Sequence, residues 1–256
     1  MRVLGHSFAA AALALWAVAA HAGWSISLDA EHFKWEEATS PTVMERGPRV
    51  GLSWEYEQLR AQGLQFAYRG QVRHGTVDYT GSFLFTGGAA TARTEYTGLL
   101  NEVQGIYRYP GSAGFELVGG LGWDYWQRNI LPNQKEDYSV LYLRMGLNVD
   151  PRSPRGWFAG AGIKFPFSVS ENAHLDELGF NQNPTLEPSG EVSPYAQVGY
   201  RFTPQWSLIG YYDSYRFGES KATAATRADT PGTTFLVFQP ASTVDTLGLR
   251  VRYTFP

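Results

Sequence analysis

The sequence predicts an all-β protein, a closed up-and-down antiparallel transmembrane β-barrel of about ten strands. Three observations predict it. Apolar residues recur at every second position in about ten segments, short turns alternate with longer polar connections, and the chain begins with an export signal. The slightly negative mean hydropathy fits this architecture, because strands that are apolar at every second residue average to near-neutral values.

The first residues have the pattern of a cleaved export signal. Arg2 supplies the positive start, an apolar run covers 8–20, and the triplet Ala-His-Ala at 20–22 is a small-x-small cleavage site. The apolar run is shorter than the roughly 20 residues that a membrane-spanning helix needs, so we favour cleavage over an anchor. We therefore expect a signal peptide at 1–22 and an outer-membrane β-barrel domain at 23–256.

The strand segments are recognised by two-residue periodicity. In the first clean segment, Val50, Leu52 and Trp54 share one face, whereas a helix would mix them with the polar residues between. The clean segments are 49–57, 115–126, 141–149, 157–165 and 246–255, and weaker alternation covers 24–36, 64–79, 94–109, 192–202 and 206–217.

The connections between these segments alternate in length. Tight turns are expected at 61–63, 110–114, 150–156 and 203–205, and longer polar loops at 37–47, 80–93, 129–137, 170–191 and 218–243. Barrels of the bacterial outer membrane have short periplasmic turns and longer extracellular loops. An even number of strands would also leave both ends of the mature chain in the periplasm.

A soluble barrel would also alternate, with its apolar face turned inward. Two features favour the membrane arrangement: a polar face that mixes Gly with charges of both signs, and aromatic residues near the strand ends. We expect one aromatic girdle beside the short turns, made of Tyr107, Tyr109, Phe115, Trp157, Phe202, Trp206, Tyr253 and Phe255. The other is expected beside the long loops, made of Trp35, Tyr56, Tyr79, Tyr96, Trp123, Tyr125, Tyr138, Phe165 and Phe167.

The last strand, Leu247 to Phe255, alternates apolar residues and ends on an aromatic one. It resembles the C-terminal strand of the small outer-membrane β-barrel proteins of Gram-negative bacteria, and the resemblance extends over the whole mature chain. It implies that Tyr253 and Phe255 form an assembly signal read by the barrel-assembly machinery, and that the barrel contacts outer-membrane lipid and lipopolysaccharide. The chain departs from the pattern in Pro256, which follows the usual terminal Phe.

The inward face carries charges of both signs. A barrel of about ten strands is little wider than an eight-stranded barrel, whose interior is filled by side chains. We therefore expect the inward charges to pair as a structural plug, with a narrow selective pore as the alternative that inward glycines leave open. The predicted lumen network is Arg49, Glu55, Glu57, Arg69, Arg73, Glu102, Glu116, Asp124, Arg144, Lys164, Arg250 and Arg252.

The mature chain has three histidines, His32, His74 and His174. Barrel proteases of the omptin type have an Asp-x-Asp and an Asp-x-His pair, whereas here His174 and Asp176 stand in the reverse order. Lipid A deacylases of the barrel type have a His-x-Ser arrangement, which none of the three histidines matches. His174 with Asp176 remains only a weak catalytic candidate.

A second weak candidate combines His74 and Asp78 with Glu95 or Asp124 across the rim. A base can activate a nucleophile only at hydrogen-bonding distance, and sequence order alone does not give that distance. We lean toward a protein that is not an enzyme.

Composition narrows the binding partners. The chain has 21 Lys and Arg against 24 Asp and Glu, a formal charge of -3, which argues against nucleic acid. It has no Cys, which excludes thiolate metal sites and thiol nucleophiles. The acidic stretch at 170–191 lacks the spacing of an EF-hand, so no metal and no cofactor are expected. The apolar run at 235–238 is expected to extend a strand, or else to contact a partner.

The resulting expectation is an integral outer-membrane β-barrel protein without catalytic activity. It would be structural, or would bind a protein or another ligand through its extracellular loops. The alternatives are a narrow outer-membrane channel and a barrel hydrolase, omptin-like or lipid-modifying, with its active site at the rim.

Overall fold

The computed structural model describes residues 22–58, 63–82, 88–111, 114–130, 134–230 and 232–256. The predicted signal peptide, apart from residue 22, lies outside these residues, and so does part of the predicted turn at 61–63.

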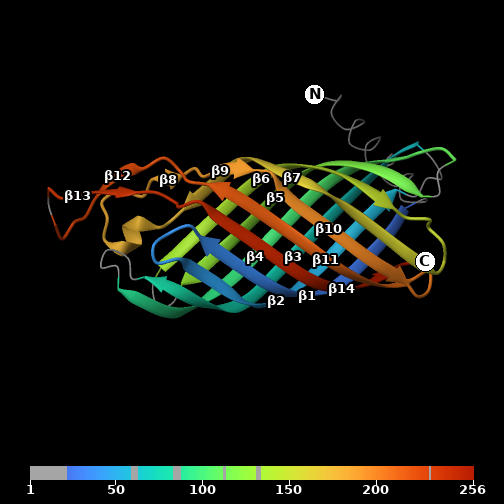
Figure 1. Ribbon diagram of the computed structural model, residues 1–256, viewed down its shortest axis with the longest axis horizontal. Coiled ribbons are helices and arrows are strands. Elements are labelled where there is room, and N and C mark those ends of the chain that lie inside the picture. Colours follow the sequence, from blue (N-terminus) through green and yellow to red (C-terminus); the bar gives the residue numbers. More distant parts are fainter. Residues whose placement is uncertain (1–21, 59–62, 83–87, 112–113, 131–133, 231) are drawn as a thin grey trace, which may run out of the picture.

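Within the described residues, ten long strands form a closed antiparallel barrel (Figure 1). Each long strand pairs with the next one along the chain, and the last pairs with the first. This confirms the predicted up-and-down barrel. The strands are β1 (Ala22–Glu37), β2 (Val43–Gln58), β3 (Gly63–Ser82), β4 (Ala89–Arg108), β5 (Phe115–Ile130), β6 (Gln134–Val149), β7 (Gly156–Asn172), β10 (Ser193–Arg201), β11 (Trp206–Gly218) and β14 (Ser242–Thr254).

Smaller elements gather at the long-loop end of the barrel, on the left of Figure 1. They are the 3-10 helix η1 (Leu175–Leu178) and the short strands β8 (Thr185–Leu186), β9 (Ser189–Glu191), β12 (Thr223–Thr226) and β13 (Thr234–Val237). Strands β12 and β13 pair only with each other, as a separate hairpin. No helix in the described part of the chain is long and apolar enough to cross a membrane.

Three of the five predicted long loops are largely strand. The connection between β1 and β2 is confined to 38–42, β3 and β4 run to Ser82 and from Ala89, and β5 and β6 run to Ile130 and from Gln134. In these extensions the outward residues are polar as well, so the alternation that marks a strand in sequence disappears. The expectation of long loops at 37–47, 80–93 and 129–137 was therefore wrong.

The outer face carries an apolar belt next to the short-turn end. On β5 the belt runs from Phe115 to Tyr125 and gives way to the outward Gln127. This length fits the about 9–11 residues with which a strand crosses a bilayer. The exposed members of the belt include Trp24, Ile26, Leu28, Val50, Leu52, Leu64, Phe66, Val72, Val103, Leu117, Leu121, Leu143, Met145, Leu147, Ile163, Phe165, Val198, Leu208, Leu247, Leu249 and Val251.

The structure agrees with one of the two expected aromatic girdles and differs in part from the other. Beside the short turns, Tyr107, Tyr109, Phe115, Trp157, Phe202, Trp206 and Phe255 are exposed on the outer face as expected. At the other end, Trp35, Tyr96 and Tyr138 are fully buried and point into the barrel. For these three residues the expectation was wrong, because near the long loops aromatic residues also occupy the inward positions of the strands. Tyr56 was misplaced as well, since it lies at the short-turn end of β2. Trp123, Phe165 and Phe167 are exposed on the outer face as expected.

These inward rings form an aromatic plug, defined as Phe33, Trp35, Tyr96, Trp126, Tyr138, Tyr142, Tyr215 and Phe217. The ring centroids of Trp35 and Tyr138 are 5.1 Å apart, although β1 and β6 lie on opposite sides of the ring of strands. Trp126 stacks on Tyr138 at 5.2 Å and contacts Tyr215 at 5.9 Å. Rings from opposite walls thus meet across the lumen at this level.

The plug predicts which tryptophan of β5 matters most for stability. We expect Trp126→Ala to lower the free energy of unfolding by about 3–5 kcal/mol, because a buried aromatic ring is replaced by a cavity. The matched control is Trp123→Ala, three positions away on the same strand and 38% exposed on the outer face. Urea unfolding of the refolded barrel in lipid vesicles measures both losses, and equal losses would contradict the plug.

Candidate functional site

The lumen at the level of the belt is filled by ion pairs. Every residue of the predicted lumen network faces inward and has an oppositely charged partner within 4 Å. Arg49 Nη2 lies 2.8 Å from Glu31 Oε2, and Arg250 Nε lies 2.5 Å from Asp29 Oδ1. Sequence reasoning missed Asp29 and Glu31, although both occupy inward positions in the alternating segment 24–36.

Several of these cations also lie over aromatic faces. Lys164 Nζ is 3.5 Å from the ring centroid of Tyr215, and Lys164 is paired with Asp213 at 2.6 Å. The guanidinium carbon of Arg49 lies 4.0 Å from the centroid of Phe33. Because a cation is attracted to the face of an aromatic ring, the charged layer and the aromatic plug pack as one continuous interior.

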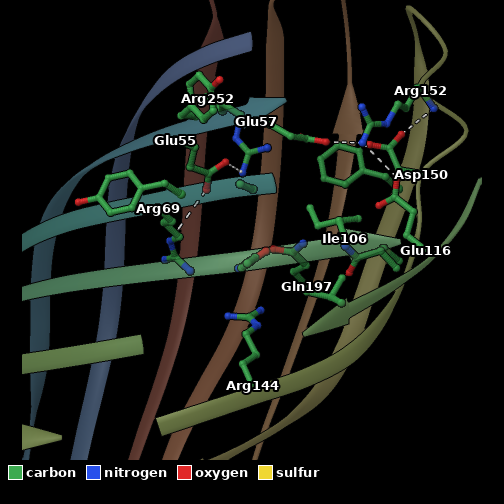
Figure 2. A pocket seen from close by; sticks show the side chains of 18 of the residues that line it. Glu55, Glu57, Arg69, Ile106, Glu116, Arg144, Asp150, Arg152, Gln197 and Arg252 are labelled. Carbon is green, nitrogen blue, oxygen red and sulfur yellow. Dashed lines mark hydrogen bonds and ion pairs between the residues drawn. The ribbon is translucent and has the colours of Figure 1, made fainter. Parts of the chain in front are cut away.

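Below the plug, a small polar chamber of about 110 Å³ lies at the short-turn end (Figure 2). Arg152 reaches into it from the turn between β6 and β7, pairing with Glu57 and, at 3.1 Å, with Glu116. Glu55 forms an ion pair with Arg252 at 2.7 Å and lies 3.9 Å from Arg69. The positive and negative side chains that line the chamber pair with one another, so the chamber is suited to a few ordered waters.

Above the plug lies a larger cavity of about 430 Å³, which we call the vestibule. Its volume falls within the range of about 300–1,000 Å³ that is usual for small-molecule sites. Residues at the long-loop ends of the barrel strands and residues of the loops line it together. Its lining includes Glu37, Val43, Tyr79, Arg128, Ile130, Glu136, Glu171, Ala173, Leu175, Leu178, Leu186, Leu236, Val237, Phe238, Gln239 and Pro240.

The loop side of the vestibule is apolar. Leu175, Phe180, Leu186 and their buried neighbours form a small core that holds η1, β8 and the β12–β13 hairpin together. The apolar run at 235–238 belongs partly to β13, so it does not extend a barrel strand. Phe235 and Val237 pack against the small core, whereas Leu236 is 70% exposed.

The barrel side of the vestibule is a cluster of four carboxylates around one guanidinium, which we call the floor. Arg128 lies 3.2 Å from Glu37, 3.0 Å from Glu45 and 2.5 Å from Glu136. The fourth carboxyl group, Glu171, is only 2% exposed, and its Oε2 makes no hydrogen bond of normal geometry among the described residues, although the nearby hydroxyl of Tyr138 acts to lower its pKa. Four carboxyl groups therefore surround one guanidinium on the floor.

The floor lies beyond the apolar belt, at the long-loop ends of its strands. Burial raises the pKa of Glu171 well above its usual value of 4.5, and the nearby carboxylate of Glu136 raises it further. Burial also raises the pKa of Glu136, despite the opposing effect of Arg128. Both shifts come first from burial, and the neighbouring carboxylates add to them.

A β-bulge decides that Glu171 belongs to this floor. Along β7 the residues from Trp157 to Phe165 alternate outward at odd positions, which would also place Glu171 outside. The pairing with β6 shifts register between Leu141 and Tyr142, and Phe167 and Ser168 are consecutive outward residues. Glu171 thereby faces inward, and such bulges often re-aim a side chain next to a functional site.

The weak catalytic candidates do not converge. His74 is on the outer face of β3, where its Nδ1 lies 3.1 Å from Thr97 Oγ1, and Asp78 is exposed on the same face. Glu95 is exposed as well, whereas Asp124 is fully buried inside the barrel. Because Asp124 lies on the other side of the barrel wall, it cannot act with His74.

The other candidate histidine, His174, anchors a loop to the barrel. His174 Nε2 lies 2.8 Å from Asp137 Oδ2 on β6, and its Nδ1 lies 3.3 Å from Glu177. Asp176, the predicted partner, is exposed on η1. His174 pairs instead with Asp137 and Glu177. In the part of the chain that the structure describes, no group of three or more His, Asp or Glu side chains is arranged to hold a metal ion.

The raised pKa of Glu171 predicts a pH-dependent effect of Glu171→Gln. A proton held in the folded state and lost in the unfolded state stabilises the fold below about pH 4.5, and this contribution disappears as the pH rises through the folded pKa. Glutamine has no proton to lose, so the variant should gain stability over the parent as the pH rises from about 4.5. Urea unfolding in lipid vesicles across this range measures the difference. The control is Glu187→Gln on the exposed loop surface, and an equal gain there would contradict the assignment.

Comparison with known proteins identifies the fold. No protein-family model and no curated protein matches the sequence. Among solved structures, the outer membrane protease OmpT from Escherichia coli is similar with a TM-score of 0.53 at 13% identity, over 91% of this chain and 96% of that one. The translocator domain of the autotransporter NalP from Neisseria meningitidis is also similar, with a TM-score of 0.42 at 10% identity over 98% of each chain. The chain has the fold of the outer-membrane β-barrel proteins of Gram-negative bacteria.

Proposed function

We propose that this chain is an integral outer-membrane protein that conducts no solute and binds a ligand in the vestibule at its long-loop end. The observation that carries the proposal is the order of features along the barrel axis. The vestibule opens at the mouth, and the aromatic plug closes the lumen beneath it. A cavity with a sealed base retains a ligand, whereas a channel needs a continuous path.

The apolar belt supports the membrane placement. It surrounds the barrel next to the short turns, and strands such as β3 and β4 continue well beyond it with polar outer faces. We infer that the short turns and both mature termini lie in the periplasm and that the vestibule faces the cell exterior. The belt would contact the lipid tails, and the polar strand extensions would contact lipopolysaccharide.

The end of β14 supports insertion by the barrel-assembly machinery. Tyr253 and Phe255 lie beside each other with ring centroids 5.2 Å apart, and Phe255 is 51% exposed on the outer face. An exposed terminal aromatic side chain is accessible to another protein before the barrel closes. The extra Pro256 is also exposed and leaves this surface open.

Binding is favoured over the two alternatives. A narrow channel would have to pass through stacked rings that meet across the lumen. A rim hydrolase would need its base, nucleophile and orienting group within hydrogen-bonding distance. Neither His74 nor His174 brings its predicted partners together.

The first test is electrical. In planar lipid bilayers, the purified barrel should produce no stepwise conductance, because the plug leaves no water-filled path. Regular conductance steps from the parent protein would refute the sealed barrel.

The second test determines orientation, and it uses the absence of cysteine in the chain. A membrane-impermeant maleimide should label Leu236→Cys on intact cells, because this residue lies at the vestibule and is 70% exposed. Pro154→Cys, exposed in the turn between β6 and β7, should be labelled only after the outer membrane is permeabilised. The reverse labelling pattern would show the opposite orientation.

A further inference from the structure

We propose that the ligand of the vestibule is a small organic ammonium with a short apolar body, bound with its charged head against Glu171 and its body against the loops. This inference rests on the proposed function and specifies the chemical class of the ligand.

The first argument is charge. On the floor, Glu37, Glu45 and Glu136 share the single guanidinium of Arg128, and Glu171 has no cation within ion-pairing distance among the described residues. Elsewhere in the lumen, carboxylates such as Glu31 and Asp124 have their own partners. A bound cation would correct the imbalance that is specific to the vestibule, and an anionic ligand would increase it.

The second argument is an unpartnered acceptor. Glu171 Oε2 belongs to a side chain that is 2% exposed, and this residue lines the vestibule. A buried acceptor without a partner is costly, and an ammonium offers three donors from a single atom. An ammonium placed beside Glu171 would also favour its ionised form, because a nearby positive charge lowers the pKa of a carboxyl group.

The third argument is the shape and chemistry of the opposite wall. Leu175, Leu178, Leu186, Leu236 and Phe238 line the same cavity as the floor. A bare metal ion or a small inorganic cation would leave this apolar surface in contact with water. A ligand with a hydrocarbon body would cover it, and each buried methylene would add to the affinity.

The experiment uses the full-length barrel in lipid nanodiscs and a matched set of ligands. Hexylammonium carries the charge and the apolar body, hexan-1-ol carries only the body, hexanoate reverses the charge, and methylammonium carries only the charge. Isothermal titration measures each affinity at neutral pH, and empty nanodiscs correct for partition into lipid. Hexylammonium should bind at least about tenfold more tightly than each of the other three.

One variant locates the charged head, one tests the apolar wall, and a third serves as control. Glu171→Gln should weaken hexylammonium about tenfold or more and leave hexan-1-ol unchanged, since only the ammonium uses the carboxylate. Leu178→Asn should weaken both ligands, because both use the apolar wall. Glu187→Gln removes the same charge from an exposed loop position and should change neither. Folded migration on unheated gels verifies each variant.

The possible outcomes separate the two proposals. If hexan-1-ol or hexanoate binds as tightly as hexylammonium, the ammonium class is wrong and the vestibule remains a binding site. If hexylammonium binds but Glu171→Gln has no effect, the assignment of Glu171 is overturned. If no ligand binds to the parent barrel, both the ammonium and the vestibule as a binding site for such ligands are rejected.

Discussion

The pairing of β14 with β1 is the constraint on which the rest of the structure depends. It closes the sheet, so that within the hydrocarbon the backbone donors and acceptors can find partners without leaving an open edge. Closure at ten strands also sets the width of the lumen. At this width Trp35 on β1 reaches Tyr138 on β6, and the interior can be sealed by side chains alone.

Closure also explains how the interior is divided along the barrel axis. Where the apolar belt surrounds the barrel, charged residues are paired and stacked on rings, because an unpaired charge is costly away from bulk water. Beyond the belt the strands continue with polar outer faces, and there a charged side chain without a partner costs less. The vestibule lies there, where the barrel rim meets loops that carry an apolar core of their own.

The floor of the vestibule departs from the pairing seen elsewhere in the lumen. A folded protein tolerates an imbalance of buried charge and unpaired polar atoms mainly where function requires it. Glu171 combines these features, since it is buried, has an unpartnered oxygen and faces inward only because of the bulge in β7. This combination makes the floor a stronger candidate than the rim histidines, which are explained by a contact with Thr97 and by a loop anchor.

The sequence by itself determined the barrel and the faces of its strands, because two-residue periodicity is a local property of an extended chain. Val50 and Leu249 could be placed outside, and Arg49 and Arg250 inside, from the alternation alone. Only the tertiary structure decided that Trp35 and Tyr138 meet inside, and that Glu37, Glu136 and Glu171 surround one cavity. Those contacts depend on closure, on strand register and on a single bulge. None of these three features can be predicted from residues that are adjacent in the sequence. The vestibule could therefore be found only in the folded structure, because no sequence motif marks it.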